Sequence, residues 1–391
     1  MMTLTWFRNG HEFRNDYLRM ALMRAHDRGE ITYRERPAAD VREVGASEAL
    51  ATHEHRHTSL FLIEDGGDRR LCAVDNEDGF IHLQGSILEE VDAYFCCPYT
   101  AAFHRDRVFP DPLPWQTAFD VAPYRDKAAA LVERFGDHFD KVRPLIPTPT
   151  SMSGGTQAMT PDERARQIRA HRLRKLAVWR SDRELWRVDQ ETYEARYRQM
   201  VGYRDRPLLH DVVSRESLWG WPENRIALHK RLHTLRSQGR DVHARLTPLA
   251  DTHALDRNEL HISPESLALL DTLTAPFTLD GPYEAALASS RLGVFPTGYH
   301  WGWRGIAFLA LCMGIPTYQD RPLYQPYFDF DEFDVVYNGG TWDQLEDLLD
   351  ATSDADWGAI KAHNQRVFDA RLAPDAVGTH LTGTFREEIV A

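Results

Sequence analysis

The segment SRLGVFPTGYHWGWRGIAFLALCMGIPTYQD, residues 290–320, decides the fold that we predict for this chain. Residues 292–296 are a short apolar run typical of a buried strand, and residues 306–313 are almost wholly apolar, which predicts a buried helix. Gly314 follows at the position where a glycine commonly ends a helix. Residues 315–318 predict the next strand. The segment therefore predicts a strand, a glycine-containing loop, a helix and a second strand, as in α/β folds.

The loop inside this segment has the composition of a phosphate-binding site. Gly298 and Gly305 allow the backbone to approach a ligand closely, and the first N–H groups of the following helix lack partners within the helix. Arg304 adds a guanidinium group whose planar fork suits phosphate oxygens. The rings of Tyr299 and Trp301 could pack on a base or a sugar. The alternative is an ordinary strand, loop and helix with a buried Trp.

The motifs of this region, taken in order, resemble the donor-binding half of GT-B glycosyltransferases, and their rhythm is nearest to exostosin-like members. The order is S-R-x-G-x-x-P-x-G, then W-x-x-R-G-x-x-x-L-A-L-x-x-G-I-P, then FDVVYNGGTWDQLEDLLD and HNQRVFDARLAP. The resemblance covers residues 211–374, and it extends to the N-terminal half only in general layout. It implies an α/β fold with two Rossmann-like domains that face each other across a cleft. It also implies a hexosyltransferase whose donor is a nucleotide sugar, with UDP expected as the nucleotide.

The chain has 391 residues, which is ample for two domains. The first predicted domain is Rossmann-like, binds the acceptor and spans residues 1–160, and a basic helical connection spans residues 161–206. The second is Rossmann-like, binds the donor and spans residues 207–374. The tail, residues 375–391, is expected to pack back on the N-terminal domain, as C-terminal helices of the family tend to do.

The composition is that of a soluble globular protein, with 42% hydrophobic and 27% charged residues. No apolar run approaches the roughly 20 residues that span a bilayer, and the N-terminus lacks the layout of a signal peptide. The four cysteines include no CxxC pair, so we expect a reducing, cytoplasmic location without structural disulfides. A net charge of −13 disfavours general binding to nucleic acids.

The N-terminus offers a candidate general base. Residues 4–7 predict a strand, and a helical pattern begins soon after His11. Because ligands of open α/β sheets bind beyond the carboxyl ends of strands, His11 is expected at the edge of the cleft. A neutral imidazole there can take the proton of an acceptor hydroxyl near pH 7, and several inverting GT-B enzymes have a His in a similar place. The alternative is that His11 only flanks the helix.

Two acidic clusters follow apolar runs in the N-terminal half. Glu64 and Asp65 follow residues 60–63, and Asp75 and Asp78 follow residues 71–74, so both clusters could face the cleft. Asp75 and Asp78 could act as the base, bind hydroxyl groups or hold a metal, and the alternative is an ordinary turn. The pattern is not a complete calcium loop.

The diphosphate and sugar of the donor have further candidate partners in the C-terminal half. Arg215 and Arg225 follow the first strand of the predicted donor domain, where the family binds the nucleotide diphosphate. Gln319 and Asp320 follow a strand where GT-B donors have their hydroxyl groups recognised. With arginines and a helix N-terminus on the phosphates, a metal is dispensable, so we predict metal-independent transfer without a cofactor other than the donor itself.

The acceptor is suggested only by a basic segment in the middle of the chain. Arg169, Arg172 and Lys175 belong to a predicted basic helix, which is either a solvated helix face or a contact surface for an anionic acceptor. A glycan or glycoconjugate is the general expectation for the family. Hydroxymethylated DNA bases are a second possibility, because phage-type enzymes that glucosylate them have a similar fold. Three competing interpretations stay open. The chain could be a non-catalytic GT-B-like protein that binds a nucleotide or a partner, a sugar-nucleotide epimerase of the same fold, or a metal-dependent transferase that uses Asp75 and Asp78.

Overall fold

The computed structural model describes residues 1–9, 13–55, 57–113, 116, 120–146, 148–149, 152, 169, 184, 186–218, 221–247, 262–274, 282–298, 301 and 304–390. Within these residues the chain is an α/β protein with one mixed and one parallel sheet, which confirms the predicted class. None of the helices in this part of the chain is long and apolar enough to cross a membrane.

Eleven strands form the two sheets in the described residues. The six-stranded sheet contains β1 (Thr3–Arg8), β2 (Thr32–Pro37), β3 (Thr58–Asp65), β4 (Asp68–Asp75), β5 (Ala93–Cys96) and β6 (Val142–Pro144). The five-stranded sheet contains β7 (His210–Ser217), β8 (Val242–Thr247), β9 (Ser290–Phe295), β10 (Thr317–Asp320) and β11 (Val335–Asn338). The apolar runs at residues 4–7 and 292–296 correspond to β1 and β9, as the sequence predicts. The strand predicted at residues 315–318 lies two residues later, as β10, so that Gln319 and Asp320 belong to the strand and do not follow it.

Helices connect and cover these strands. The first part of the chain contains α1 (Asp16–Asp27), α2 (Glu48–Ala51), α3 (Gly85–Glu90), α4 (Ala101–His104) and α5 (Ala122–Phe135), with 3-10 helices at Phe13–Asn15, Ala38–Val44, Phe80–His82 and Gly136–Lys141. The second part contains α7 (Trp186–Gly202), α8 (Pro222–Ser237), α9 (Pro264–Leu273), α10 (Tyr283–Leu287), α11 (Gly305–Met313), α12 (Leu345–Ala351), α13 (Asp354–Arg371) and α14 (Pro374–Val390), with a 3-10 helix at Phe330–Glu332.

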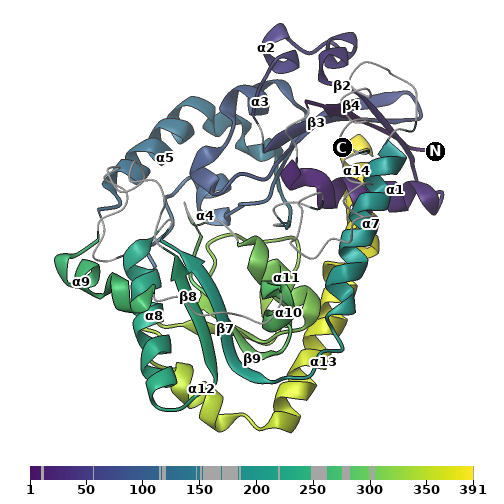
Figure 1. Cartoon of the computed structure of the whole chain (residues 1–391). Helices are drawn as coiled ribbons and strands as arrows, with labels where there is room; N and C mark the ends of the chain where they lie inside the picture. Colours follow the sequence, from purple (N-terminus) through teal and green to yellow (C-terminus); the bar gives the residue numbers. More distant parts are fainter. Residues whose placement is uncertain are drawn as a thin grey trace.

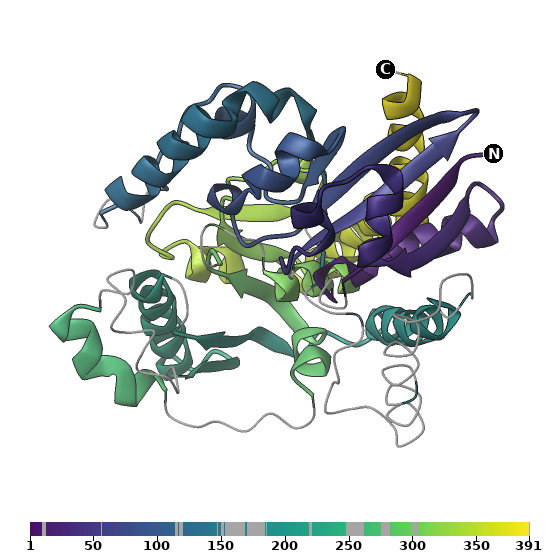
Figure 2. The same cartoon turned by 90° about the horizontal axis from the view of Figure 1, so that it is seen from above.

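The six-stranded sheet has the order β2-β1-β3-β4-β5-β6, and β3 runs antiparallel to both of its neighbours. Alternate residues of its strands point to opposite layers of helices. Phe61 and Ile63 of β3 belong to the apolar core shared with α1 and α14, whereas Leu60 and Leu62 belong to the core shared with α3 and α5. Figure 2 shows this sheet, in purple and blue, with α14 in yellow against it.

The antiparallel pairing of β3 and β4 corrects one prediction. Gly66 and Gly67 connect the two strands as a hairpin turn, with φ angles of 62° and 107° that glycine adopts without strain. The turn lies at the end of the sheet away from the carboxyl end of β4. Glu64 and Asp65 therefore do not share an edge with Asp75, and the prediction that both acidic clusters face the same cleft is wrong.

The five-stranded sheet is parallel throughout and has the order β11-β10-β9-β7-β8. The chain adds β8 on one side of β7 and then adds β9, β10 and β11 on the other side. The strand order therefore reverses between β7 and β9, and ligands of open α/β sheets bind beyond the carboxyl ends of the strands at such a switch point.

Helix α11 begins and ends where the sequence predicts. Gly314 has a φ angle of 81° in the left-handed region, and its N–H donates to the carbonyl of Leu311 at 3.0 Å. The next N–H, that of Ile315, donates to the carbonyl of Ala310 at 2.9 Å, which ends the helix. Residues Ala307 to Met313 are all buried, as expected for a helix that is apolar on every side.

Helices from both ends of the chain share one apolar core. The ring of Tyr17 in α1 meets that of Phe308 in α11 edge-on at 5.1 Å between centroids, and the Tyr17 hydroxyl donates to the carbonyl of Leu372. Figure 1 shows α13 beside the five-stranded sheet and α14 reaching the six-stranded sheet, so that the two termini lie near each other. The helix α14 packs against α1.

Candidate functional site

A pocket open to solvent lies beyond the carboxyl ends of β9 and β10, beside the switch point. Its empty space, counted together with the open solvent at its mouth, is about 300 Å³. The pocket is lined by residues from the end of β9, from the start of α11 and from the end of β10 with the loop after it: Phe295, Pro296, Thr297, Gly298, Trp301, Arg304, Ala307, Gln319, Asp320, Pro322 and Tyr324. Residues 290–320 therefore form most of the wall.

Arg304 is held at the start of α11 by an acidic residue that the sequence did not single out. It occupies the N-cap position in an extended conformation, and its Nη1 pairs with Oε2 of Glu216 on β7. Arg225 donates to the same oxygen at 3.0 Å and to the carbonyl of Ser217 at 2.8 Å. Glu216 is the sole described residue that accepts a hydrogen bond from the Arg304 side chain, which is 17% exposed. Part of the guanidinium fork therefore remains available at the pocket wall.

The pKa values near these two arginines indicate a positive potential. Burial, together with repulsion from Arg304, lowers the pKa of Arg225 to about 9, although Glu216 and Asp320 act in the opposite direction. Burial, followed by Arg225 and Arg304, lowers the pKa of His229 in α8 to about 3. His229 is therefore a neutral imidazole at pH 7. The positive end of the α11 dipole points to the same region, so the surroundings favour an anion.

Asp320 connects four elements around the pocket. One of its carboxylate oxygens accepts hydrogen bonds from the Asn224 side chain at 2.6 Å and the Thr297 N–H at 2.7 Å, and the other accepts from the Asn338 side chain at 2.8 Å. Burial raises the pKa of Asp320, and these three donors oppose the rise. Asp320 therefore fixes the ends of β9, β10 and β11 and the start of α8. These bonds already occupy both oxygens that the sequence assigns to donor hydroxyls.

Trp301 lies between the pocket and the first half of the chain. Its ring centroid is 5.8 Å from those of Phe80 and Phe109, 4.9 Å from that of Tyr124 and 5.2 Å from that of Trp221. The backbone holds Trp301 in the left-handed region, with a φ angle of 64°, which is unusual for a side chain of this size. Other rings already surround the indole, so a contact with a base would have to displace one of them. Its buried Nε1–H has no acceptor among the described residues.

Only some of the remaining predicted donor-binding residues line the pocket. Gly298 and Gln319 line the pocket, and the Gln319 side chain makes no hydrogen bond with another described residue. Gly305 is the first residue of α11. Arg215 is an exposed residue of β7 that does not line the pocket, and its backbone N–H donates to the Tyr283 hydroxyl at 3.2 Å. Tyr299 lies outside the described residues.

The candidate bases lie in the first half of the chain or outside the described residues. Asp75 is fully buried at the end of β4, where the Tyr94 hydroxyl donates to it at 2.5 Å and the Glu77 N–H at 3.0 Å. Burial and the charge of Glu77 raise its pKa to about 8. Asp78 is partly exposed and forms an ion pair with Arg14 at 2.7 Å. Neither carboxylate lines the pocket, and His11 lies outside the described residues.

The predicted basic contact surface is described at one position only. Arg169 is an exposed helical residue, whereas Arg172 and Lys175 lie outside the described residues. Within the described part of the pocket, no three His, Cys, Asp or Glu side chains lie close enough to hold a metal ion.

Glu216 and Asn224 are the site residues that the sequence argument missed. Glu216 is a charged residue at a buried position of β7, and its side chain is 1% exposed. Asn224 bridges two buried groups, because its amide nitrogen donates to Asp320 and its oxygen accepts from Trp342 Nε1 at 2.9 Å. A charged or polar residue among apolar residues of a buried element is the sequence signal for such a site, because a buried polar group normally has a hydrogen-bond or ion-pair partner.

No protein-family model matches this chain, and no curated protein sequence shows significant similarity to it.

Proposed function

We propose that this protein is a glycosyltransferase that binds a nucleoside-diphosphate sugar, with UDP as the nucleotide, and transfers the hexose to a hydroxyl group. The observation that carries the proposal is the position of Arg304 at the N-terminus of α11, in a pocket beside the switch point of a parallel sheet. The motif order of residues 290–320, which resembles the donor-binding half of GT-B enzymes, supports the same assignment. The two Rossmann-like domains of that fold are part of the proposal.

The donor diphosphate would lie against the start of α11. The first N–H groups of the helix have no partner within it, and the free part of the Arg304 fork adds donors of fixed charge. Gln319, which also lines the pocket, offers an amide to sugar or ribose hydroxyls. Glu216 holds Arg304 in place without taking up its whole guanidinium group.

The reaction requires two charge changes, and the chain has candidates for both. A base takes the proton of the acceptor hydroxyl while its oxygen bonds to the anomeric carbon, and the bond from that carbon to the diphosphate oxygen breaks. Arg304 and the N-terminus of α11 stabilise the charge of the departing UDP. His11 is our first candidate for the base, and Asp78 is the second. Asp75 is the weakest of the three, because protein donors enclose its carboxylate.

The proposal is tested by incubating the protein with a set of UDP-sugars and measuring release of UDP, with and without glycan acceptors and hydroxymethylated DNA. We expect release with one sugar, unchanged in the presence of a chelator. His11→Ala should abolish release, whereas Asp75→Asn should retain it with normal donor binding. Loss of release in Asp75→Asn alone would reverse the assignment of the base, and no release with any donor would reject the transferase function.

A non-catalytic nucleotide-binding protein is the second candidate, and the enclosure of both carboxylates favours it: Asp75 and Asp320 accept all their hydrogen bonds from the protein. In that case UDP would raise the melting temperature without any turnover. Stabilisation should reach about 2.7 kcal/mol at a hundredfold excess over Kd. Turnover of any UDP-sugar would exclude this candidate.

A further inference from the structure

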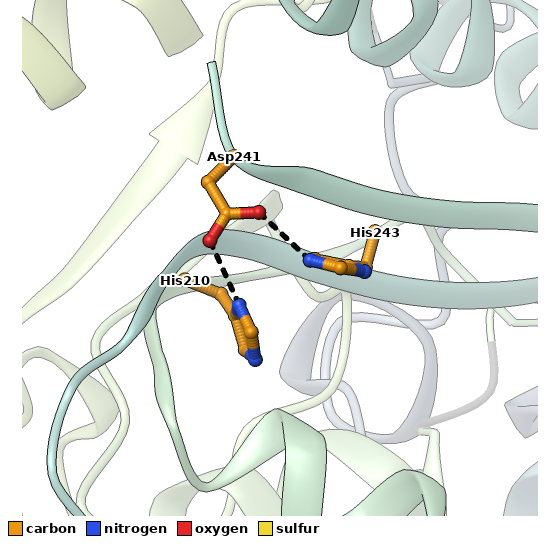
Figure 3. A group of neighbouring side chains, drawn as sticks. All are labelled: His210, Asp241 and His243. Atoms are coloured by element: carbon orange, nitrogen blue, oxygen red, sulfur yellow. Dashed lines mark hydrogen bonds and ion pairs between the residues drawn. The ribbon is translucent and has the colours of Figure 1, made fainter. Parts of the chain in front are cut away.

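Three side chains that the proposed reaction does not use lie together at the other end of the five-stranded sheet. Figure 3 shows Asp241 between His210 and His243, with one carboxylate oxygen directed at each imidazole. The distances are 2.9 Å from Asp241 Oδ2 to His210 Nδ1 and 2.7 Å from Asp241 Oδ1 to His243 Nε2. The three residues thus offer two ring nitrogens and a carboxylate, and their ligand atoms lie within 4.8 Å of one another.

The backbone of two adjacent strands fixes this group. His210 begins β7, and Asp241 directly precedes β8, which contains His243. The Asp241 N–H donates to the Asp211 carboxylate at 3.0 Å, and the Asp211 N–H donates back to the Asp241 carbonyl at 3.0 Å. Asp211 in turn accepts from Arg291 at 2.6 Å. The three side chains are therefore brought together by the sheet itself.

The chemistry of this group matches one class of metal ion. Two imidazoles and a carboxylate form the set of three protein ligands found in zinc sites that keep a position open for water. Imidazole nitrogen is a common ligand of Zn²⁺, whereas Mg²⁺ and Ca²⁺ prefer oxygen.

The site is accessible and separate from the pocket. The side chains of His210, Asp241 and His243 are 25%, 51% and 30% exposed, which leaves room for a metal ion with a bound water. The pocket lies beyond the carboxyl ends of the parallel strands, and this group lies at their amino ends, roughly 20 Å away along an eight-residue strand. A metal here would not contact the donor phosphates.

We propose that His210, Asp241 and His243 bind a Zn²⁺ ion, through His210 Nδ1, His243 Nε2 and a carboxylate oxygen, with water in the fourth position. The ion takes the place of the two hydrogen bonds in Figure 3 and joins the first residues of β7 and β8. This inference is independent of the glycosyltransferase proposal, because the two sites share no residue.

The test uses the full chain without a polyhistidine tag, freed of metal with a chelator, and a chromophoric competitor that reports free Zn²⁺. We expect one tight Zn²⁺ per chain. His210→Ala and His243→Ala should each weaken binding roughly tenfold or more. His233→Ala is the matched control, since His233 is an exposed residue of the neighbouring helix α8, and it should bind as the wild type does. Circular dichroism establishes that each variant is folded.

Substitution of Co²⁺ for Zn²⁺ gives a second measurement. The wild type should show visible absorption of a four-coordinate nitrogen and oxygen site, and the double variant of His210 and His243 should not. Arg304→Ala should keep this spectrum even if it loses donor binding, so failure of one proposal is distinguishable from failure of the other. Equal Zn²⁺ affinity in the wild type and the double variant, or no binding by the wild type, would overturn the inference.

Discussion

Glu216 at the end of β7 forms an ion pair with Arg304 at the start of α11, and thereby joins two strand-loop-helix units across the switch point. Arg225 contributes a second cation to the same carboxylate at 3.0 Å. One buried acid therefore holds two arginines in one place. The Glu216 carboxylate thus stabilises the positive charges of Arg225 and Arg304 at the pocket in the absence of a bound anion.

Removing the charge of Glu216 should destabilise the fold. Glu216→Gln leaves the buried Arg225 cation without its counter-charge, and breaking a buried ion pair in this way costs about 3–5 kcal/mol. Urea unfolding monitored by circular dichroism measures the free energy. Glu346→Gln is the control, because Glu346 pairs with Arg231 while both side chains are partly exposed, and it should cost less than about 1 kcal/mol. An equal loss of unfolding free energy in the two variants would show that the buried ion pair of Glu216 contributes no more to stability than the exposed pair of Glu346.

His229 should make the protein sensitive to acid. Its pKa is about 3 in the folded chain and 6.5 in the unfolded chain, so the unfolded chain binds a proton first as the pH falls. Stability is therefore lost between pH 6.5 and pH 3, by roughly 2 kcal/mol at pH 5. His229→Leu should remove this loss. The substitution should be tolerated at pH 7, because the His229 Nε2 has no hydrogen-bond partner among the described residues.

The measurement is the free energy of unfolding at pH 7 and pH 5 for the wild type and His229→Leu. The variant should lose about 2 kcal/mol less than the wild type between these values. His233→Gln changes an exposed histidine of the same helix, and it should follow the wild type. If His229→Leu lost as much unfolding free energy as the wild type between pH 7 and pH 5, His229 would have to be protonated at pH 5 in the folded protein.

Trp301 should contribute to stability as well as to the pocket. Trp301→Ala removes an indole that contacts four other rings, among them Phe80 and Tyr124 of the first half of the chain. Truncating a buried Trp costs about 3–5 kcal/mol. Urea unfolding should show this loss, and Phe13→Ala, at a ring that is 37% exposed, should show a much smaller one. A small loss at Trp301 would indicate that the two halves of the chain are not coupled through this ring.

Local signals predicted the elements around the pocket because each signal lies within a few residues. The apolar run of α11 and the glycine that ends it are adjacent in sequence, so Gly314 could be assigned from its neighbours. The hairpin at Gly66 and Gly67 was missed for a different reason. The apolar runs at residues 60–63 and 71–74 indicate its two strands, but Glu64 and Asp65 beside the glycines give no sign of the short turn that makes these strands antiparallel.

The interactions that complete the site could not be predicted, because they join residues far apart in the chain. Glu216 meets Arg304 only once β7 and β9 are paired, and 88 residues separate the two in sequence. The same holds for His210 and Asp241, which become neighbours through the register of β7 and β8. Sequence spacing gives no such register, since parallel strands are joined by long connections. Arg304 was found because its motif is local.

Titration calorimetry of UDP into the wild type and Arg304→Ala, with Arg236→Ala as control, tests the central claim most directly. Arg236 is an exposed residue of the last turn of α8, far from the pocket. Losing a charged hydrogen bond costs about 1.5–3 kcal/mol, so Arg304→Ala should bind UDP roughly tenfold more weakly or worse. The wild type and Arg236→Ala should bind alike. Equal binding of UDP by the wild type and Arg304→Ala would contradict the account.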